Sequence, residues 1–122
     1  MKVTRIMHAS VNVSGDLKEA DRFYADVLGL ASATRPDIPG VGGRWFSAGG
    51  AQVHLVDAAS RGSGIDPTGP HFCLGVEDMD AAVAELEERG IECVGVTTEG
   101  VRQIWFCDPA GNTVEMQQDR PL

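Results

Sequence analysis

Residues 105–116 read Trp-Phe-Cys-Asp-Pro-Ala-Gly-Asn-Thr-Val-Glu-Met and predict the β-hairpin on which the fold of this chain depends. An apolar run leads into an Asp-Pro-x-Gly turn, in which proline fixes the backbone of one residue and Gly111 and Asn112 are expected to supply a positive φ. In the strand that follows, alternation separates Glu115 from its apolar neighbours. Burying this carboxylate costs free energy unless a partner compensates it, so its face of the strand is either solvated or a site.

The chain contains this hairpin twice, which favours a site over a solvated face. Each half places a histidine at the head of its first strand and a tryptophan at the start of its hairpin. The matched pairs are His8 with His71, Trp45 with Trp105 and His54 with Glu115, at separations of 63, 60 and 61 positions. Such similarity at a nearly fixed period indicates two copies of one structural unit.

Hydrophobic periodicity and turn residues predict a strand, a helix and three further strands in each half. The first half has a strand over 3–13, a helix over 16–28 capped by Ser14 or Asp16 and ended by Gly29, and strands over 31–35, 43–47 and 51–56. The second half has a strand over 71–76, a helix over 79–89 capped by Asp78 and ended by Gly90, a strand over 91–97 and the 105–116 hairpin. The segment 58–70 is rich in Gly, Ser and Pro and is expected to be a linker.

The predicted fold is therefore α+β, with one βαβββ module over about 1–57 and a second over 71–122. Each module is too small to close a core by itself, so the two are expected to form a single domain around a shared cleft. On that geometry the four repeat-related polar residues His8, His54, His71 and Glu115 converge. Three imidazoles and one carboxylate suit zinc, nickel, cobalt, manganese or ferrous iron, whereas calcium and magnesium prefer oxygen ligands.

The role of His54 stays open at this point. His8, His71 and Glu115 can hold a metal ion by themselves, and His54 can then act as a base or contact the substrate.

Strand parity predicts further pocket residues on the faces of the four ligands. Those expected to bind substrate are Ser10 and Asn12 beside His8, Gln52 beside His54, and Gln103 and Trp105 across the hairpin from Glu115. Core packing is an equal alternative for the tryptophans. Cys73 is expected to be a buried apolar filler, and Arg44 and Arg102 are expected to be surface charges.

Composition limits the classes of partner and compartment. The 122 residues are 43% hydrophobic and carry a formal net charge of −8, which argues against nucleic acid or an anionic membrane surface. No apolar run is long enough to cross a membrane, and the N-terminus lacks the apolar segment of a secretory signal. Three scattered cysteines, Cys73, Cys93 and Cys107, fit free thiols in the reducing cytoplasm.

Three motifs resemble the vicinal oxygen chelate (VOC) superfamily, which includes glyoxalase I, bleomycin-resistance proteins and extradiol dioxygenases. They are His8 followed by Asp16-Leu17 and residues 23–30, His71 followed by residues 78–82 and Gly90, and the 105–115 hairpin. The resemblance covers essentially the whole chain. It implies paired βαβββ modules, a homodimer, and a divalent metal chelated by neighbouring oxygens of a small-molecule substrate. Many glyoxalases have glutamate at the position of His54, so this chain departs from their pattern.

The resemblance leaves three functions open. The first is a glyoxalase-type lyase or isomerase, in which the metal stabilises an enediolate and Glu115 or His54 moves the proton. The second is a ring-cleaving dioxygenase with iron on His8, His71 and Glu115. The third is a bleomycin-resistance-type binding protein without catalysis. A linker of this length also allows modules to be exchanged between two chains.

Overall fold

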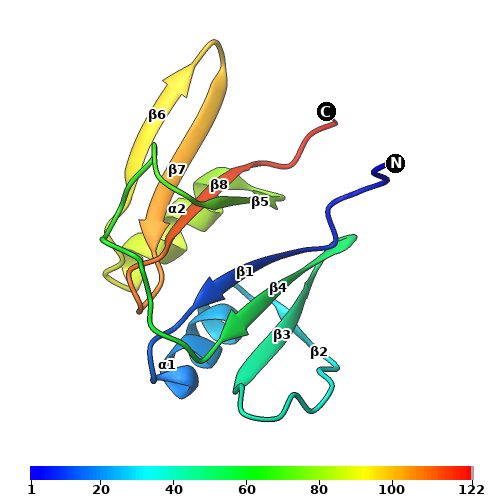
Figure 1. Cartoon of the computed structure of the whole chain (residues 1–122). Coiled ribbons are helices and arrows are strands. Elements are labelled where there is room, and N and C mark those ends of the chain that lie inside the picture. Colours follow the sequence, from blue (N-terminus) through cyan, green and yellow to red (C-terminus); the bar gives the residue numbers. More distant parts are fainter. Residues whose placement is uncertain (122) are drawn as a thin grey trace. The chain divides into compact units, whose positions relative to one another are not determined.

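The computed structural model describes residues 1–121, which divide into two compact units that are described separately below. The first unit comprises Met1–Arg61, and the second begins at Gly62. Each contains one four-stranded mixed sheet and its helix (Figure 1). The chain thus has the α+β fold with two βαβββ modules that the sequence predicts. That the two modules form one domain with a shared cleft stays a prediction.

The first unit contains six elements in the predicted order. They are β1 (His8–Asn12), α1 (Leu17–Arg22), the π-helix η1 (Phe23–Val27), β2 (Ala31–Ala33), β3 (Gly43–Ala48) and β4 (Ala51–Val56). The sheet order is β1-β4-β3-β2, in which β1 and β4 are parallel and the other pairs are antiparallel. The first and last strands of the module are therefore neighbours.

The second unit repeats this topology. Its elements are β5 (Phe72–Val76), α2 (Met79–Glu88), β6 (Val94–Thr98), β7 (Val101–Cys107) and β8 (Thr113–Gln118). The sheet order is β5-β8-β7-β6, and β5 and β8 form its parallel pair. Strand β8, which carries Glu115, is consequently an interior strand of the sheet.

The helices begin at aspartate caps. The side chain of Asp16 accepts a hydrogen bond from Glu19 N, and that of Asp78 accepts one from Ala81 N, each at 3.0 Å. Such caps satisfy backbone donors that have no partner in the first turn of a helix. The single helix predicted over 16–28 is an α-helix that continues as the π-helix η1, which ends just before Leu28.

A separate core lies between each sheet and its helix. In the first unit the fully buried side chains include Tyr24, Phe46 and Leu55, and in the second they include Phe106 and Val114. These residues alternate along their strands with the polar residues of the opposite face, as the period of a β-strand requires. The face of each sheet that turns away from the helix is therefore free to carry a site.

The turn in the 105–116 hairpin forms as predicted, with one difference. Gly111 has a φ of 82°, and its N–H donates to Asp108 O at 3.0 Å. Asn112 keeps a negative φ and instead stabilises the turn, because its N–H donates to Asp108 Oδ1 and its Nδ2 donates to Asp108 Oδ2. The aspartate side chain, and not a second left-handed residue, completes the reversal.

Several predicted boundaries differ from the structure: β6 begins at Val94 and not at residue 91, and β2 ends at Ala33 and not at residue 35. Strand β1 begins at His8 and not at residue 3, because its neighbour β4 begins only at Ala51 and the register starts with His8 opposite Gln52. Gln52 N still donates to Met7 O at 3.0 Å, at the edge of this pairing. Within the segment 58–70, which is expected to be a linker, Gly64 and Asp66 belong to the second unit and are hydrogen-bonded to Gly111 and Thr113 of that unit. Within residues 1–121, no helix is long and apolar enough to cross a membrane.

Candidate functional site

Glu115 lies at the centre of the polar face of the second sheet. It stands opposite Cys73 of β5 and Trp105 of β7 in the strand register. His71 precedes β5 and is two residues from Cys73, which places both on the face of Glu115. The register therefore brings together a histidine and a carboxylate that are 44 residues apart.

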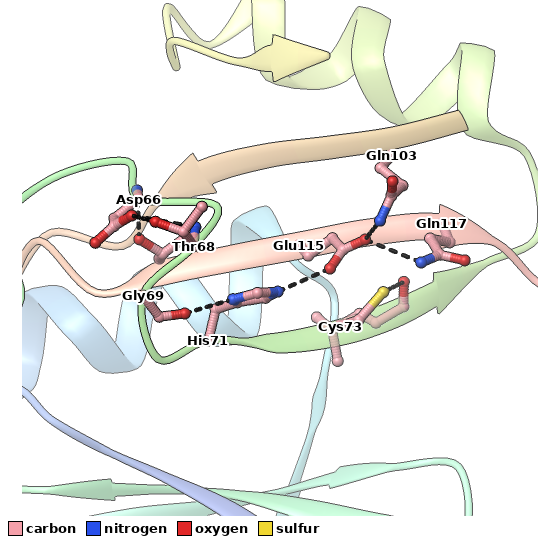
Figure 2. A network of polar contacts seen from close by, with 10 residues as sticks. Asp66, Thr68, Gly69, His71, Cys73, Gln103, Glu115 and Gln117 are labelled. Carbon is pink, nitrogen blue, oxygen red and sulfur yellow. Dashed lines mark hydrogen bonds and ion pairs between the residues drawn. The ribbon is translucent and has the colours of Figure 1, made fainter. Parts of the chain in front are cut away.

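Three hydrogen bonds hold the carboxylate of Glu115, which is only 4% exposed (Figure 2). Oε1 accepts from Gln103 Nε2 at 2.8 Å and from Gln117 Nε2 at 2.9 Å, and Oε2 lies 2.9 Å from His71 Nε2. Burial alone would raise the pKa of Glu115, but these hydrogen bonds and the charge of His71 together lower it below the ordinary value of 4.5. The carboxylate is therefore charged at neutral pH.

Both ring nitrogens of His71 face acceptors. Nδ1 lies 2.8 Å from Gly69 O, and Nε2 lies 2.9 Å from Glu115 Oε2. The hydrogen bond to Gly69 raises the pKa of His71 above 6.5, burial opposes this, and Glu115 adds to the increase. A protonated ring satisfies both acceptors, because each nitrogen then carries a proton.

The same arrangement fits a divalent metal ion. A neutral ring that keeps its proton on Nδ1, held by the Gly69 carbonyl, presents the lone pair of Nε2 toward Glu115. Histidine ligands are typically oriented in this way by a carbonyl or carboxylate on the second nitrogen. His71 Nε2 and Glu115 Oε2 are thus two suitable ligand atoms already within 2.9 Å of each other.

The equivalent pair in the first unit is a stack of rings. His54 lies between His8 and Trp45, with ring centroids 4.0 Å apart on each side and interplanar angles of 15° and 0°. Its Nε2 lies 2.8 Å from Gln52 Oε1. Burial, followed by the charges of His8 and Arg35, lowers the pKa of His54 below 6.5. His54 is therefore a neutral imidazole at pH 7, and binding a metal through Nε2 requires Gln52 to release it.

A pocket of about 630 Å³ opens beside this stack within the first unit. Its lining consists of Arg5, Met7, His8, Trp45, Ser47, Gln52, His54 and the turn residues 49–51. Ser10 and Asn12, which were expected to bind substrate, do not line it. Asn12 Nδ2 instead donates to Ala59 O at 3.1 Å, which ties β1 to the chain beyond β4.

Trp105 is 6% exposed, so its ring is largely buried within the second unit. Its Nε1 is a buried donor without a hydrogen-bond partner among residues 1–121. An unsatisfied donor of this kind costs about 1–3 kcal/mol. That Trp105 binds substrate stays a prediction.

Cys73 is exposed, so the expectation that it fills a buried apolar space is wrong. Its Sγ lies 3.8 Å from Leu74 O, and Cys73 stands opposite Glu115 in the strand register. Partial desolvation and then the negative charge of Glu115 raise the pKa of its thiol to about 11. A thiol with this pKa is a poor nucleophile at neutral pH.

Arg44 and Arg102 lie on the helix-facing sides of their sheets, as expected of surface charges. Arg44 pairs with Asp21 at 3.8 Å, and Arg102 pairs with Asp80 at 2.5 Å. Both pairs are well exposed, so neither contributes charge to the candidate site.

The structure therefore brings the predicted ligands together in pairs. Within residues 1–121 there is no group of three or more His, Cys, Asp or Glu side chains that could hold a metal ion. That His8 and His54 join His71 and Glu115 in one site stays a prediction. Gln117 was not predicted as a site residue, although its spacing of two from Glu115 places it on the same face.

Comparisons with known proteins agree with this architecture. Residues 5–116 match the family described as the Glyoxalase/Bleomycin resistance protein/Dioxygenase superfamily. No curated protein matches the chain significantly.

Several solved structures are similar over nearly the whole chain. A glyoxalase family protein from Bacillus anthracis is 24% identical, with a TM-score of 0.85 and coverage of 98% of both chains. Lactoylglutathione lyase from Agrobacterium tumefaciens is 26% identical, with a TM-score of 0.75 and coverage of 97% of this chain and 96% of that one. TnmS3, an antibiotic binding protein from Streptomyces sp. CB03234, is 34% identical, with a TM-score of 0.69 and coverage of 98% and 99%. The chain belongs to the glyoxalase/bleomycin resistance protein/dioxygenase superfamily, the VOC superfamily, and has its fold of two βαβββ modules.

Proposed function

We propose that this protein is a divalent-metal-dependent enzyme of glyoxalase type, a lyase or isomerase that acts on a small substrate with two neighbouring oxygens. The observation that carries the proposal is the pair of His71 Nε2 and Glu115 Oε2, 2.9 Å apart and supported by Gly69, Gln103 and Gln117. Metal ligands typically have a hydrogen-bond partner on their remaining polar atoms, and both His71 and Glu115 have such partners.

The proposed metal is zinc, nickel, cobalt, manganese or ferrous iron, held by His71 and Glu115 together with His8 and, as an open question, His54. Nitrogen ligands favour these ions over calcium and magnesium. When bound, the metal supplies Lewis-acid polarisation of the substrate oxygens. The proposal includes the cytoplasmic location and the homodimer implied by the resemblance.

His54 is the better of the two proposed bases. Its lowered pKa keeps the ring neutral at pH 7, so one of its nitrogens can accept a proton from the substrate. If Nε2–H donates to Gln52, the lone pair is on Nδ1. Glu115 is charged, but its three hydrogen bonds and lowered pKa make it a weak base.

Proton exchange provides the test. The metal-loaded protein is incubated in D₂O with a panel of α-hydroxyketones and thiohemiacetals, and loss of the α-proton is followed by NMR. We expect exchange with the loaded wild type, none after chelation, and a loss of at least about 100-fold in His54→Gln with metal retained. Exchange of the α-proton at the same rate before and after removal of the metal by a chelator would contradict the proposal.

A second candidate function is binding of a planar small molecule without catalysis. The 34% identity to an antibiotic binding protein and the ring-lined pocket beside Trp45 favour it. Binding of aromatic ligands measured by calorimetry, lost in Trp45→Leu and kept in Trp45→Phe, would support this function. Binding with no turnover of any panel compound would place the protein in this class. The ring-cleaving dioxygenase stays a further alternative and requires iron.

A further inference from the structure

We infer that the turn Asp66-Pro67-Thr68-Gly69 positions His71 for metal binding, so that residues 62–69 form a strap that belongs to the metal site. This inference rests on the proposed function, because it concerns the same metal. Asp66 and Thr68 are positioning residues in this account, since both act through the carbonyl of Gly69 and neither contacts the metal.

The strap is anchored to the hairpin that carries Glu115. Asp66 N donates to Thr113 Oγ1 at 3.0 Å, and the same hydroxyl donates to Gly64 O at 2.9 Å. A third hydrogen bond, from Gly64 N to Gly111 O at 3.3 Å, joins the strap to the hairpin turn. Thr113 begins β8 and lies two residues from Glu115. The strap is therefore anchored to the same strand that carries the carboxylate.

The turn itself is locally rigid. Gly69 N donates to Asp66 O at 3.2 Å, and Asp66 Oδ1 accepts from Thr68 N at 3.1 Å and from Thr68 Oγ1 at 3.0 Å (Figure 2). Asp at the first position, Pro at the second and Gly at the fourth are the residues that a type I turn favours. Pro70 further restricts the backbone of Gly69.

Gly69 lies in close approach to the side chain of Asp66, which a larger residue at position 69 would displace. A Cβ at this position would lie 2.4 Å from Asp66 Oδ2 and 2.8 Å from Asp66 Cγ. The aspartate that closes the turn can therefore pack against the backbone only when residue 69 has no side chain.

The end of this turn is the acceptor for His71. Gly69 O lies 2.8 Å from Nδ1, while Nε2 faces Glu115. Hydrogen bonds thus connect Thr113 to Asp66 of the strap, and Gly69 of the strap to His71. This connection selects the ring orientation of His71 and the tautomer with a proton on Nδ1. Loss of such an outer partner typically weakens metal affinity 10- to 100-fold.

The test compares Zn²⁺ affinities of full-length variants by competition with a chromophoric chelator. We expect Asp66→Ala and Gly69→Ala to weaken binding at least 10-fold. Asp66→Asn retains the Oδ1 acceptor and is expected to recover most of the affinity. Thr68→Val removes one hydroxyl and is expected to weaken binding a few-fold, whereas Thr68→Ser restores it.

A second readout does not depend on metal. In ¹⁵N-histidine spectra of the metal-free protein, the Nδ1–H of His71 is expected to be protected from exchange in the wild type and in Thr68→Ser, and to be lost in Asp66→Ala. Wild-type affinity together with a protected Nδ1–H in Asp66→Ala and Gly69→Ala would overturn the inference. If those two variants fail to fold, equal affinities of Thr68→Val and Thr68→Ser would overturn it. If the wild type binds neither Zn²⁺ nor any of the other proposed ions, the proposed function fails, and the Nδ1–H signal still decides whether the strap orients His71.

Discussion

His71 Nε2 lies 2.9 Å from Glu115 Oε2, and the residues at the equivalent positions of the other unit, His8 and His54, stack with their ring centroids 4.0 Å apart. The same topology thus holds an ion pair in one unit and a pair of rings in the other. In the first of these pairs, the neutral form of His71 and the charged Glu115 each offer a suitable ligand atom, while the stack desolvates the neutral base His54.

The ion pair predicts the pH range in which the metal-free protein is most stable. The pKa of Glu115 is lowered from 4.5, so its contribution is present above 4.5 and is lost as pH falls through the lowered value. The pKa of His71 is raised from 6.5, so its contribution is present below 6.5 and is lost as pH rises through the raised value. The free energy of unfolding from urea titrations is therefore expected to carry the full contribution between pH 4.5 and 6.5, on the order of 1–3 kcal/mol.

His71→Gln is the control for this pH dependence. In this variant the decrease in stability above pH 6.5 is expected to be smaller. If the decrease in the free energy of unfolding above pH 6.5 is the same in this variant as in the wild type, another group is responsible for it.

The ring stack predicts an unusual titration of His54. Trp45→Ala removes the ring that desolvates one of its faces, so the pKa of His54 is expected to rise toward 6.5. Trp45→Phe keeps an aromatic ring in place and is expected to leave the pKa low. Histidine ring chemical shifts followed against pH measure both, and the same pKa in the Ala and Phe variants would count against the stack as the cause.

Cys73 reports on the charge of Glu115. The carboxylate contributes to the thiol pKa of about 11, so Glu115→Gln is expected to lower that pKa and to accelerate alkylation of Cys73 at pH 8. Peptide mapping after reaction with iodoacetamide separates Cys73 from Cys93 and Cys107, which serve as internal controls. Equal acceleration at all three thiols would indicate general loosening and not a local charge effect.

The two cores predict local effects of core mutations. Phe106 and Phe46 are 0% and 1% exposed and occupy repeat-related positions, so Phe→Ala at either is expected to cost about 3–5 kcal/mol. Val96→Ala, on an exposed strand, is a control expected to cost under about 0.5 kcal/mol. Hydrogen exchange is expected to rise mainly over 72–118 in Phe106→Ala and mainly over 8–56 in Phe46→Ala. The same profile in both variants would contradict separate cores.

Much of this structure could be predicted from the sequence, because repeat and alternation are properties of single strands. The repeat matches His54 with Glu115 and Trp45 with Trp105, which predicts the same strand pairing in both halves. In the structure Trp45 lies opposite His54, and Trp105 lies opposite Glu115. The aspartate caps and the Asp-Pro-x-Gly turn of the 105–116 hairpin depend on contacts between near neighbours, which sequence patterns report well.

The contacts that the sequence did not reveal are those between distant segments. A Gly- and Pro-rich stretch favours a flexible linker, and only the hydroxyl of Thr113 shows that residues 62–69 are attached to β8. The apolar residues Val3 and Ile6 suggest a longer first strand, but β4 offers them no partner and they remain exposed. The exposure of Cys73 depends on what covers its sheet, which alternation within one strand does not specify.

Metal content tests the central claim most directly. The protein is purified without an affinity tag that binds metal, and elemental analysis is done on wild type, His71→Ala, Glu115→Gln and His54→Ala. We predict near-stoichiometric zinc, nickel, cobalt, manganese or iron in the wild type and a loss of that metal in His71→Ala and Glu115→Gln. Retention in His54→Ala would make His54 a base, and loss would make it a ligand. A wild type that contains no metal and takes up none on titration with any of these ions would contradict the account.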